Sequence, residues 1–316
     1  MFNVTIIEQK IGDRQGQEAG IGFGDVVNEL DKKYDATGLQ EAIQNNARRI
    51  IYYQQPDGLM YRLLRANFDG LPSADLLIGA DRIHSTIRQL VGAPTGRYAG
   101  YVSLRGTINE QELSRQTCEY FSDYVVPTDD RNFTPGERLI NFVWYYNIAD
   151  SSAEMNDVFS DINRKHHRKT VPVGLVRLGI WEKVRGPIQI AEPFAEVLAK
   201  VKSPFVTNIN DSIRGCAYFY DDKVVLVGDA FASFRPHVAA ATEQCAYHSN
   251  SLERVYVGQK THETSEDDVR RYARQMILLN RIIGYLGRSA FFSLFKSLTS
   301  YIIFVLWQKL GRRKVP

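Results

Sequence analysis

Short, continuous runs of hydrophobic residues occur near the start of the chain and in two later places. The runs 2–8, 75–79 and 224–228 are rich in valine, isoleucine and leucine. Continuous apolar runs of this length are typical of strands that are buried on both faces, as in an α/β sheet. We therefore predict an α/β layer in which the strand at 2–8 pairs with strands that come much later in the chain.

Helical patterns accompany these runs, and a different pattern separates them. Helices are predicted at 25–34, 83–91, 193–202 and 239–256, and 59–67 is predicted to end another helix. Hydrophobic and polar residues alternate in three other segments, 98–107, 139–148 and 173–181. This alternation indicates antiparallel strands with one face covered and the other over a cavity or solvent. The α/β layer thus brackets an antiparallel insertion.

The composition indicates a folded protein and excludes several other classes. Of the 316 residues, 44% are hydrophobic and 24% are charged, which is enough to bury a sizeable core. The formal net charge is only +3, so bulk charge predicts no nucleic-acid partner. The three cysteines form no CxxC pair, and residues 1–11 lack the features of a signal peptide. We therefore expect a cytoplasmic protein.

The histidines do not indicate a metal site. His166 and His167 are adjacent in the sequence. Neighbouring positions point in different directions, so these two side chains cannot easily share one ion. We therefore predict no metal ligands, and no Ser-His-Asp or Cys-His arrangement identifies a catalytic residue.

The C-terminal region differs from the rest of the chain in charge. Residues 270–316 carry ten Lys or Arg residues and no acid, whereas residues 1–269 carry 29 basic and 36 acidic residues. Residues 290–307 are mostly apolar and nearly long enough to span a bilayer, although Lys296 interrupts them. One interpretation is membrane contact through 290–307, with the basic residues 312–314 at an anionic leaflet. The alternative is an amphipathic helix packed on the body of the protein.

Two of the apolar runs deliver an aspartate at their carboxyl ends. Asp81 follows the run at 75–79, and Asp229 follows the run at 224–228. Ligands of open α/β sheets bind at this edge, where a carboxylate can accept hydrogen bonds from a sugar. Each aspartate is therefore a candidate binding residue, and the alternative is that each one caps the helix that follows.

The sequences around both turns resemble a known family. The stretch ADLLIGADRIHSTIR at 74–88 resembles the DG motif of the FAD-dependent aromatic hydroxylases of the para-hydroxybenzoate hydroxylase type. The stretch VVLVGDAFASFRPHVAAATEQCAYH at 224–248 resembles their GD motif. Its Arg235-Pro236-His237 is similar to the dihydroxypyridine 3-monooxygenase branch. The resemblance implies a monooxygenase that uses FAD, NAD(P)H as reductant and oxygen to hydroxylate a small aromatic or heteroaromatic molecule.

The resemblance also implies domains. Residues 1–97 would form the first part of an FAD-binding domain, 98–207 a substrate-binding antiparallel sheet, 208–258 the second part of the FAD-binding domain, and 259–316 a helical, basic tail. The expected fold class is thus α/β, with an incomplete Rossmann-like domain, an antiparallel substrate sheet and C-terminal helices.

Two cofactor-binding residues are implied in the first part of the chain. Glu8 matches the acid that hydrogen-bonds the adenosine ribose of FAD, and Arg65 matches the arginine near the pyrophosphate. Carboxylates accept hydrogen bonds from vicinal hydroxyls, and arginine binds phosphate oxygens with two donors. The alternatives are a solvated strand end for Glu8 and a surface helix residue for Arg65.

Four more positions are implied at the two turns. Gly228 and Asp229 match the GD pair, in which the aspartate holds the ribityl chain of the flavin. Pro236 lies where the family packs a proline beside the flavin ring. Asp81 matches the aspartate that shapes the dinucleotide and NAD(P)H region.

The sequence departs from the family pattern in three ways. The family's first strand and its GxGxxG turn, which precede the ribose-binding acid, have no match, so we expect an N-terminally truncated domain. Only Pro72 and Ser73 connect pieces that the family separates by a block of strands. Arg82 replaces the glycine of the DG motif, and Ala239 and Ala241 stand where relatives often have glycine. These departures leave a second hypothesis open, a non-catalytic fragment or binding module without tightly bound flavin.

The substrate face of the predicted sheet depends on its register. Tyr101, Arg105, Trp144, Tyr145 and Tyr146 all lie on candidate strands. A shift of one residue moves every side chain of a strand to the other face. The sequence therefore leaves open which of these five residues face a cavity.

Overall fold

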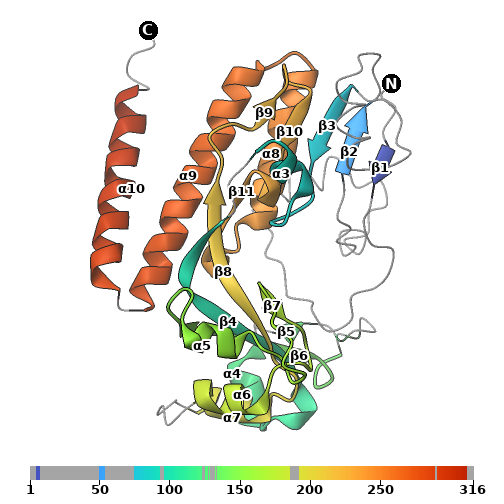
Figure 1. The fold of residues 1–316 in the computed structure, drawn as a ribbon, viewed down its shortest axis with the longest axis vertical. Helices are drawn as coiled ribbons and strands as arrows, with labels where there is room; N and C mark the ends of the chain where they lie inside the picture. The colour runs from blue at the N-terminus through green and yellow to red at the C-terminus, as the bar shows by residue number, and fades with distance from the viewer. Residues whose placement is uncertain are drawn as a thin grey trace. The chain divides into compact units, whose positions relative to one another are not determined.

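The computed structural model describes most of the chain from residue 75 onward (Figure 1). The described residues are 5–7, 50–53, 75–92, 96–122, 125–126, 128, 132, 134–185, 192–288 and 290–311, of which 5–7 and 50–53 are described by their backbone alone. The predicted helices at 25–34 and 59–67 lie outside these residues.

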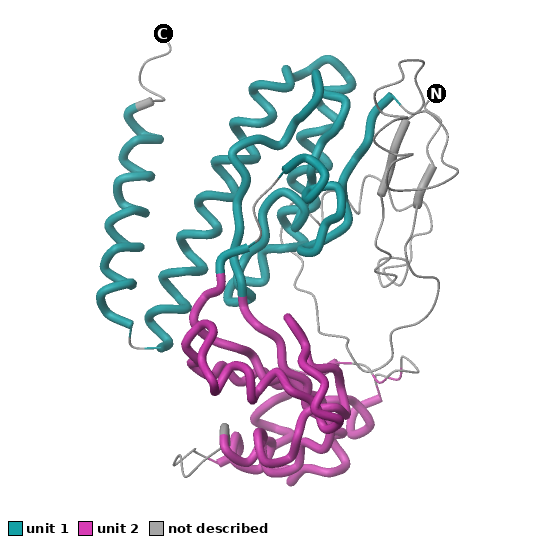
Figure 2. Tube along the Cα trace, viewed as in Figure 1, with its two compact units in different colours: residues 1–11, 21–97, 210–316 teal, residues 12–20, 98–209 magenta. Residues whose placement is uncertain are grey.

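The chain divides into two compact units (Figure 2). Unit 1 comprises residues 1–11, 21–97 and 210–316, and unit 2 comprises residues 12–20 and 98–209. Unit 1 is therefore built from segments on both sides of unit 2 in the sequence.

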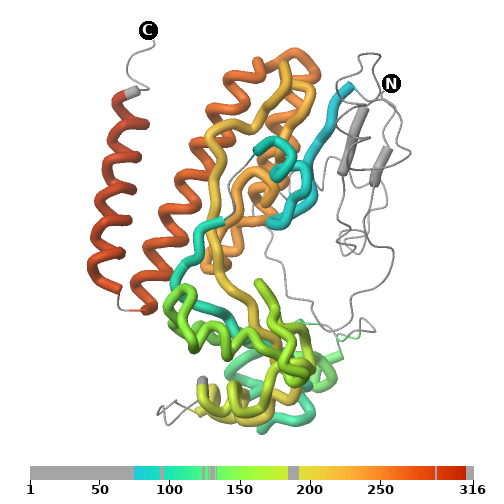
Figure 3. Tube along the Cα trace, viewed as in Figure 1, coloured from blue at the N-terminus to red at the C-terminus, as the bar shows by residue number. Residues whose placement is uncertain are grey.

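Unit 1 contains a five-stranded sheet in the order β1-β2-β3-β10-β9. The strands are β1 (Thr5–Ile7), β2 (Ile50–Tyr53), β3 (Leu76–Gly79), β10 (Val224–Leu226) and β9 (Tyr218–Phe219). β3 and β10 run parallel and the other neighbouring pairs run antiparallel. The two apolar runs at 75–79 and 224–228 are thus central neighbours, although they lie far apart along the chain (Figure 3).

The helices of unit 1 bury both faces of this sheet. These are α3 (Thr86–Leu90), α8 (Ala241–Tyr256) and α9 (His262–Leu286), whereas α10 (Phe291–Gly311) packs beside α9. Leu77 and Leu226 pack with Ile87 of α3 and Val269 of α9, whereas Ile78 belongs to a second cluster that Leu252 of α8 joins. Burial on both faces explains why the strands read as continuous apolar runs.

Unit 2 is an antiparallel sheet, as the alternating pattern predicts. Its path is β8-β4-β6-β5, and β7 pairs with β8 on the side away from β4. The strands are β4 (Arg97–Asn109), β5 (Val125–Val126), β6 (Leu139–Asn147), β7 (Thr170–Val171) and β8 (Phe205–Ile213). The last residues of β8 belong to unit 1, where they pair with β11 (Ala232–Ser233).

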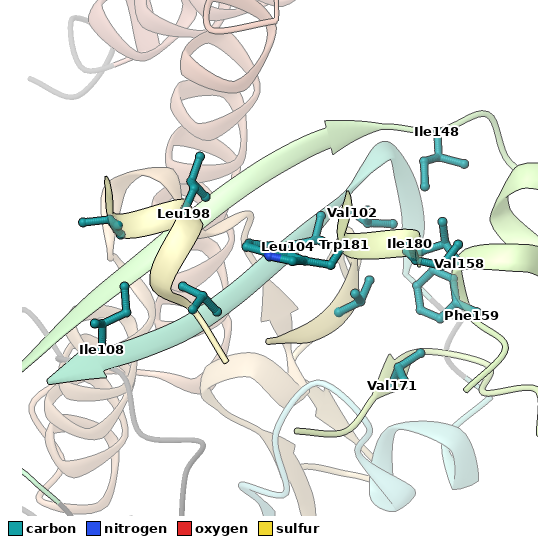
Figure 4. Close-up of a cluster of buried hydrophobic side chains, with 13 residues drawn as sticks. Val102, Leu104, Ile108, Ile148, Val158, Phe159, Val171, Ile180, Trp181 and Leu198 are labelled. Atoms are coloured by element: carbon teal, nitrogen blue, oxygen red, sulfur yellow. The ribbon is translucent and has the colours of Figure 1, made fainter. Parts of the chain in front are cut away.

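Short helices cover one face of the unit 2 sheet. They are η2 (Glu110–Glu112), α4 (Arg115–Tyr120), α5 (Ala153–Val158), α6 (Leu178–Arg185) and α7 (Phe194–Lys200). Val102 and Leu104 of β4 form one buried cluster with Trp181 of α6 and Leu198 of α7 (Figure 4). The even-numbered residues of β4 therefore face the helices.

The strand predicted at 173–181 is wrong, because these residues form a turn that leads into α6. Ile180 and Trp181 are each 4% exposed, whereas Leu178 is 69% exposed. The segment has only nine residues, two of which are Gly174 and Gly179. The spacing of so few apolar residues does not distinguish a strand, with a period of two, from a helix.

Candidate functional site

Two strand-to-helix turns lie next to each other at one edge of the unit 1 sheet. Leu226, at the end of β10, pairs with Gly79, at the end of the parallel strand β3. Asp81 follows shortly after Gly79, and Asp229 follows shortly after Leu226. Parallel neighbours end at the same edge of a sheet, so the structure brings the two predicted turns together.

Asp81 holds the start of α3 with one of its two carboxylate oxygens. Its Oδ2 accepts hydrogen bonds from the backbone N–H groups of Thr86 at 2.6 Å and Ile87 at 3.2 Å. Its Oδ1 is buried and has no hydrogen-bond partner among the described residues. Asp81 therefore has the helix-capping role that was the alternative to binding, and one acceptor atom remains unused.

Arg82, at the position of the family's glycine, has an unusual backbone conformation. Its φ is +64°, which lies in the left-handed region. Residues other than Gly, Asn and Asp adopt this backbone conformation only at a cost in free energy. The turn after β3 thus keeps a conformation that suits glycine, even though the residue there is arginine.

Gly228 is fixed by its surroundings at the end of β10. Its φ is +55°, and a Cβ atom at this position would lie 2.6 Å from the Sγ of Cys245. Its backbone N–H donates to Nδ1 of His248 at 2.8 Å. His248 is 2% exposed, and burial lowers its pKa to about 3, so the ring stays neutral and can accept this hydrogen bond. Helix α8 therefore clamps the turn that presents Asp229.

Asp229 carries a half-buried carboxylate to which no described residue donates a hydrogen bond. Burial raises its pKa to about 6, and the positive charges of Arg82 and Arg88 only partly oppose this shift. A desolvated carboxylate without donors is costly for the protein alone. The same carboxylate is a ready acceptor for the hydroxyl groups of a ligand at this edge.

Arg88 links the two turns through hydrogen bonds of its side chain. Its side chain donates to the hydroxyl of Ser212 at 3.1 Å and to the carbonyl oxygen of Asp229 at 3.4 Å, and it also donates to the carbonyl oxygen of Ile83. It is 6% exposed, and burial lowers its pKa. The sequence analysis did not select Arg88, because a single arginine on a short helix gives no signal of burial.

The turn continues into the segment that contains Pro236. Pro236 is exposed at the first position of η5 (Pro236–Val238). Ala239, which ends η5, has a φ of +48°. Ala239 is therefore a second position with left-handed backbone where relatives often have glycine. Glu8 and Arg65, the remaining implied cofactor residues, lie outside the described residues.

The register of unit 2 separates the five aromatic and basic residues that the sequence left unassigned. Ser103 pairs with Tyr145, and Leu104 pairs with Trp144. Trp144 and Tyr146 pack against the buried cluster beneath the helices, so they face the core. Tyr101 and Tyr145 lie on the opposite face, where their rings meet edge to face at 5.5 Å. Arg105 shares this second face, because it is two residues from Ser103 along β4.

Three comparisons relate this chain to known proteins. The family described as FAD binding domain-like matches residues 98–211. The 2,6-dihydroxypyridine 3-monooxygenase of Paenarthrobacter nicotinovorans is 26% identical over 210 residues, which is 60% of this chain and 50% of that protein. The chain thus spans about half the length of this curated relative.

Solved structures show the same fold. The 2,6-dihydroxypyridine-3-hydroxylase of Arthrobacter nicotinovorans has a TM-score of 0.60 and 21% identity over 77% of this chain and 62% of that chain. CtdE in complex with FAD has a TM-score of 0.50 and 14% identity over 69% of this chain and 55% of that chain. The chain is thus similar in sequence to a 2,6-dihydroxypyridine 3-monooxygenase and similar in fold to solved flavin-dependent hydroxylases.

The chain contains an α/β layer, an antiparallel sheet and C-terminal helices, and its fold is similar to that of a solved hydroxylase. The predicted fold class is therefore confirmed. The predicted domain boundaries and cofactor residues stay predictions, and the described residues contain no group of three or more His, Cys, Asp or Glu side chains that could hold a metal ion.

A buried ionic network joins the segment that leads into η5 to helix α9. Asp211 is 2% exposed and accepts hydrogen bonds from Arg235 at 2.7 Å and from Arg281 at 2.6 and 2.9 Å. Burial raises the pKa of Asp211, but the two arginines outweigh this effect and leave the pKa below its ordinary value. Arg235 also donates to the hydroxyl of Tyr285 at 3.2 Å.

Helix α9 approaches this turn closely at Gly284. A Cβ atom at Gly284 would lie 2.6 Å from Nε2 of His237. Burial and the charges of Arg235 and Arg288 lower the pKa of His237 to about 4, so its ring is neutral near pH 7. Sequence reasoning missed this support, because its residues come from three distant segments.

Proposed function

We propose that this chain binds FAD and acts as a flavin-dependent monooxygenase that hydroxylates a small aromatic or heteroaromatic molecule. NAD(P)H would reduce the flavin, and the bound cofactor supplies the oxygen chemistry. The observation that carries the proposal is Asp229. Its carboxylate lies at the carboxyl end of a central parallel strand, receives no hydrogen bond from the described residues, and has a pKa raised to about 6.

The residues at the sheet edge fit the sugar-like parts of the cofactor. Asp229 would accept hydrogen bonds from ribityl hydroxyls, and the left-handed turn at Gly228 holds this carboxylate in place. Pro236 is exposed beside the turn and would pack against the flavin ring. Asp81 keeps a buried, unpartnered Oδ1 for a further donor near the NAD(P)H region. Glu8 and Arg65 remain the proposed ribose and pyrophosphate residues.

The first test is a titration of the purified 316-residue chain with FAD, followed by gel filtration and a visible absorbance spectrum. We expect flavin to remain with the protein, and we expect Asp229→Asn to weaken the affinity between about ten- and hundredfold, the value of a lost charge-assisted hydrogen bond. Asp221→Asn is the matched control, because Asp221 is exposed on the β9–β10 turn. NADH and NADPH oxidation with aromatic substrates then tests catalysis.

Retention of flavin by Asp229→Asn as strong as that of the unaltered chain would refute the assignment of this carboxylate. A chain that retains no flavin would favour the second hypothesis, a non-catalytic fragment or binding module.

We also propose that α10 contacts an anionic membrane surface from the cytoplasmic side. By length and composition, Phe291–Leu310 is long and apolar enough to cross a membrane. Only 11% of its apolar window is buried in the protein, unlike a core helix. It packs beside α9 through Phe304, which is 4% exposed and lies under the guanidinium of Arg274 at 5.5 Å. Nine of its large apolar side chains are exposed, namely Phe291, Phe292, Phe295, Leu298, Ile302, Ile303, Leu306, Trp307 and Leu310.

The charge of this region favours a surface of anionic lipid, because residues 270–316 contain ten basic residues and no acid. We expect the chain to sediment with phosphatidylcholine vesicles that contain phosphatidylserine, and less so at high salt. The double variant Phe292→Glu and Phe295→Glu should stay in the supernatant. Leu178→Glu is the control, since Leu178 is 69% exposed, close to the 70% of Phe295, but belongs to unit 2. Equal sedimentation of all three proteins, or none, would refute membrane contact.

A further inference from the structure

A buried histidine of α8 has one ring nitrogen that lacks a partner. His248 is 2% exposed, and its Nδ1 accepts a hydrogen bond from the backbone N–H of Gly228 at 2.8 Å. Because the ring is neutral and Nδ1 is the acceptor, the ring proton lies on Nε2. This Nε2 is buried and has no hydrogen-bond partner among the described residues. His248 therefore carries a buried donor that needs an acceptor.

A small cavity lies against this histidine, between the unit 1 sheet and helices α8 and α9. It has room for about one water molecule. Three of the residues that line it have polar side chains, namely His248, Tyr218 and Ser265, and the others are alanine, valine and leucine. A molecule in this cavity would thus find its polar side-chain partners in these three residues.

Three hydroxyl groups form a hydrogen-bonded row that starts at the cavity. The hydroxyl oxygens of Tyr218 and Ser265 lie 3.0 Å apart, and those of Ser265 and Ser251 lie 2.9 Å apart. The row ends at Lys260, whose Nζ donates to the Ser251 hydroxyl at 3.1 Å and lies 2.5 Å from a carboxylate oxygen of Asp268. The row therefore links the cavity to an ion pair beside the connection between α8 and α9.

The hydroxyl groups have one proton more than the row uses. They carry three protons, but only two hydrogen bonds join them. The ammonium group of Lys260 repels the Ser251 proton and directs it toward Ser265. The surplus proton therefore lies on Tyr218 or Ser265, the two hydroxyls that line the cavity. Burial raises the pKa of Tyr218, so its hydroxyl is not ionised.

Two donors thus face one cavity, the Nε2–H of His248 and one hydroxyl of the Tyr218–Ser265 pair. Two donors cannot bond to each other, whereas one water oxygen accepts both hydrogen bonds at once. A cation offers no acceptor, and an anion would lose its hydration at a large cost. The size of the cavity and the chemistry of its walls therefore both favour a single water molecule.

We propose that one internal water molecule binds in this cavity and accepts hydrogen bonds from His248 and from the Tyr218–Ser265 pair. The water holds the ring proton on Nε2, which leaves Nδ1 to accept from the Gly228 N–H. His248 is then a positioning residue for the carboxylate of Asp229, the next residue after Gly228. The water site does not depend on the proposed monooxygenase function, but its effect on flavin binding rests on that function.

The first test locates the water by NMR on the full chain with ¹⁵N-labelled histidine at pH 7. The nitrogen chemical shifts distinguish a ring protonated on Nε2 from one protonated on Nδ1. NOE and ROE spectra detect a water molecule that stays beside the Nε2 proton for longer than the protein takes to tumble. We expect the Nε2–H form of His248 with such a water beside it. Exposed His166 is the control and should show only exchange with bulk water.

Two variants of His248 test whether its donor holds the water. His248→Leu has no donor, whereas the amide of His248→Gln places an N–H donor near the position of Nε2. Oxygen-17 relaxation dispersion of water counts the long-lived internal waters. We expect one fewer in His248→Leu than in the wild type, and no loss in His248→Gln or in the control His166→Leu. Circular dichroism checks that each variant folds, and the spectra of the wild type decide independently should His248→Leu not fold.

The same variants test the positioning role. His248→Leu should weaken FAD binding between about three- and tenfold, the value of one lost hydrogen bond, and should speed hydrogen exchange of the Gly228 amide. His166→Leu should change neither reading.

The water site and the flavin proposal fail separately. A ring proton on Nδ1, no long-lived water beside Nε2, or equal numbers of internal waters in His248→Leu and the wild type would each overturn the water site. Equal FAD affinity of His248→Leu and the wild type would overturn the positioning role. A chain that retains no flavin would refute the monooxygenase, and the NMR readings would still decide the water site.

Discussion

Replacing Asp229 with asparagine removes a buried charge while keeping the size of the side chain. The ordinary pKa of an aspartate is 3.8, and burial raises that of Asp229 to about 6. The folded state therefore binds the proton more tightly than the unfolded state, so the wild-type chain loses stability as the pH rises from about 4 to about 6. The asparagine variant does not titrate, so it escapes this loss.

The expected gain follows from the two pKa values. The free energy of unfolding of Asp229→Asn should exceed that of the wild type by about 0.5 kcal/mol at pH 4, about 1.5 kcal/mol at pH 5 and about 3 kcal/mol at pH 7. The value at pH 7 is an upper bound, because asparagine in the same place still lacks a hydrogen-bond partner. The stronger test is therefore how the difference in the free energy of unfolding between variant and wild type changes with pH.

Urea unfolding followed by far-UV circular dichroism measures this difference at each pH. Only the difference between variant and wild type is used, because other groups titrate equally in both proteins. Asp221→Asn is the control and should give a difference near zero at every pH, since Asp221 is exposed. A difference for Asp229→Asn that does not grow between pH 4 and pH 6, or that is negative, would refute the argument that this carboxylate is desolvated and unpaired.

Three further substitutions test other parts of the site. Arg82→Gly should stabilise the chain by about 0.5–1 kcal/mol because it relieves the left-handed backbone at this position. Arg270→Gly, at an exposed position of α9, should instead cost about 1 kcal/mol in the same thermal unfolding assay. His248→Leu should cost about 1–3 kcal/mol because the Gly228 N–H loses its acceptor, and exposed His166→Leu should change stability by less than about 0.5 kcal/mol in urea unfolding. Arg105→Met should raise stability by about 1 kcal/mol, because the Nε of Arg105 is buried without a partner among the described residues, and a loss of that size would show that the charge is neutralised in the protein.

The central strands and the long helix after them were predictable from sequence, because their signals are local. Residues 76–79 and 224–226 form continuous apolar runs, and such runs indicate burial whichever way the side chains point. The register of the unit 2 sheet was not predictable. Trp144 faces the core and Tyr145 faces away from it, and only the pairing with β4 decides between these two arrangements.

Strand β8 was missed because its polar residues have partners far away in the sequence. Asp211 looks like a loop residue, yet it is buried on β8 and bound by Arg235 and Arg281. Arg88 is similar, since Ser212, which accepts its hydrogen bond, is 124 residues away along the chain. A buried polar residue gives no signal of burial in its own neighbourhood, so the support of the candidate site became visible only in three dimensions.

Arg82 couples the backbone conformation of one turn to the charge on the other. Its positive charge lowers the pKa of Asp229, so Arg82→Gly relieves backbone strain and at the same time leaves the ionised carboxylate less stabilised. At pH 4, where Asp229 is protonated, the substitution should show its full gain, and at pH 7 the gain should be smaller. In the Asp229→Asn background the gain should be the same at both pH values. A double-mutant cycle of Arg82→Gly and Asp229→Asn, measured at both pH values, tests this electrostatic coupling. If the gain from Arg82→Gly is independent of pH in the wild-type background, the two turns do not interact electrostatically.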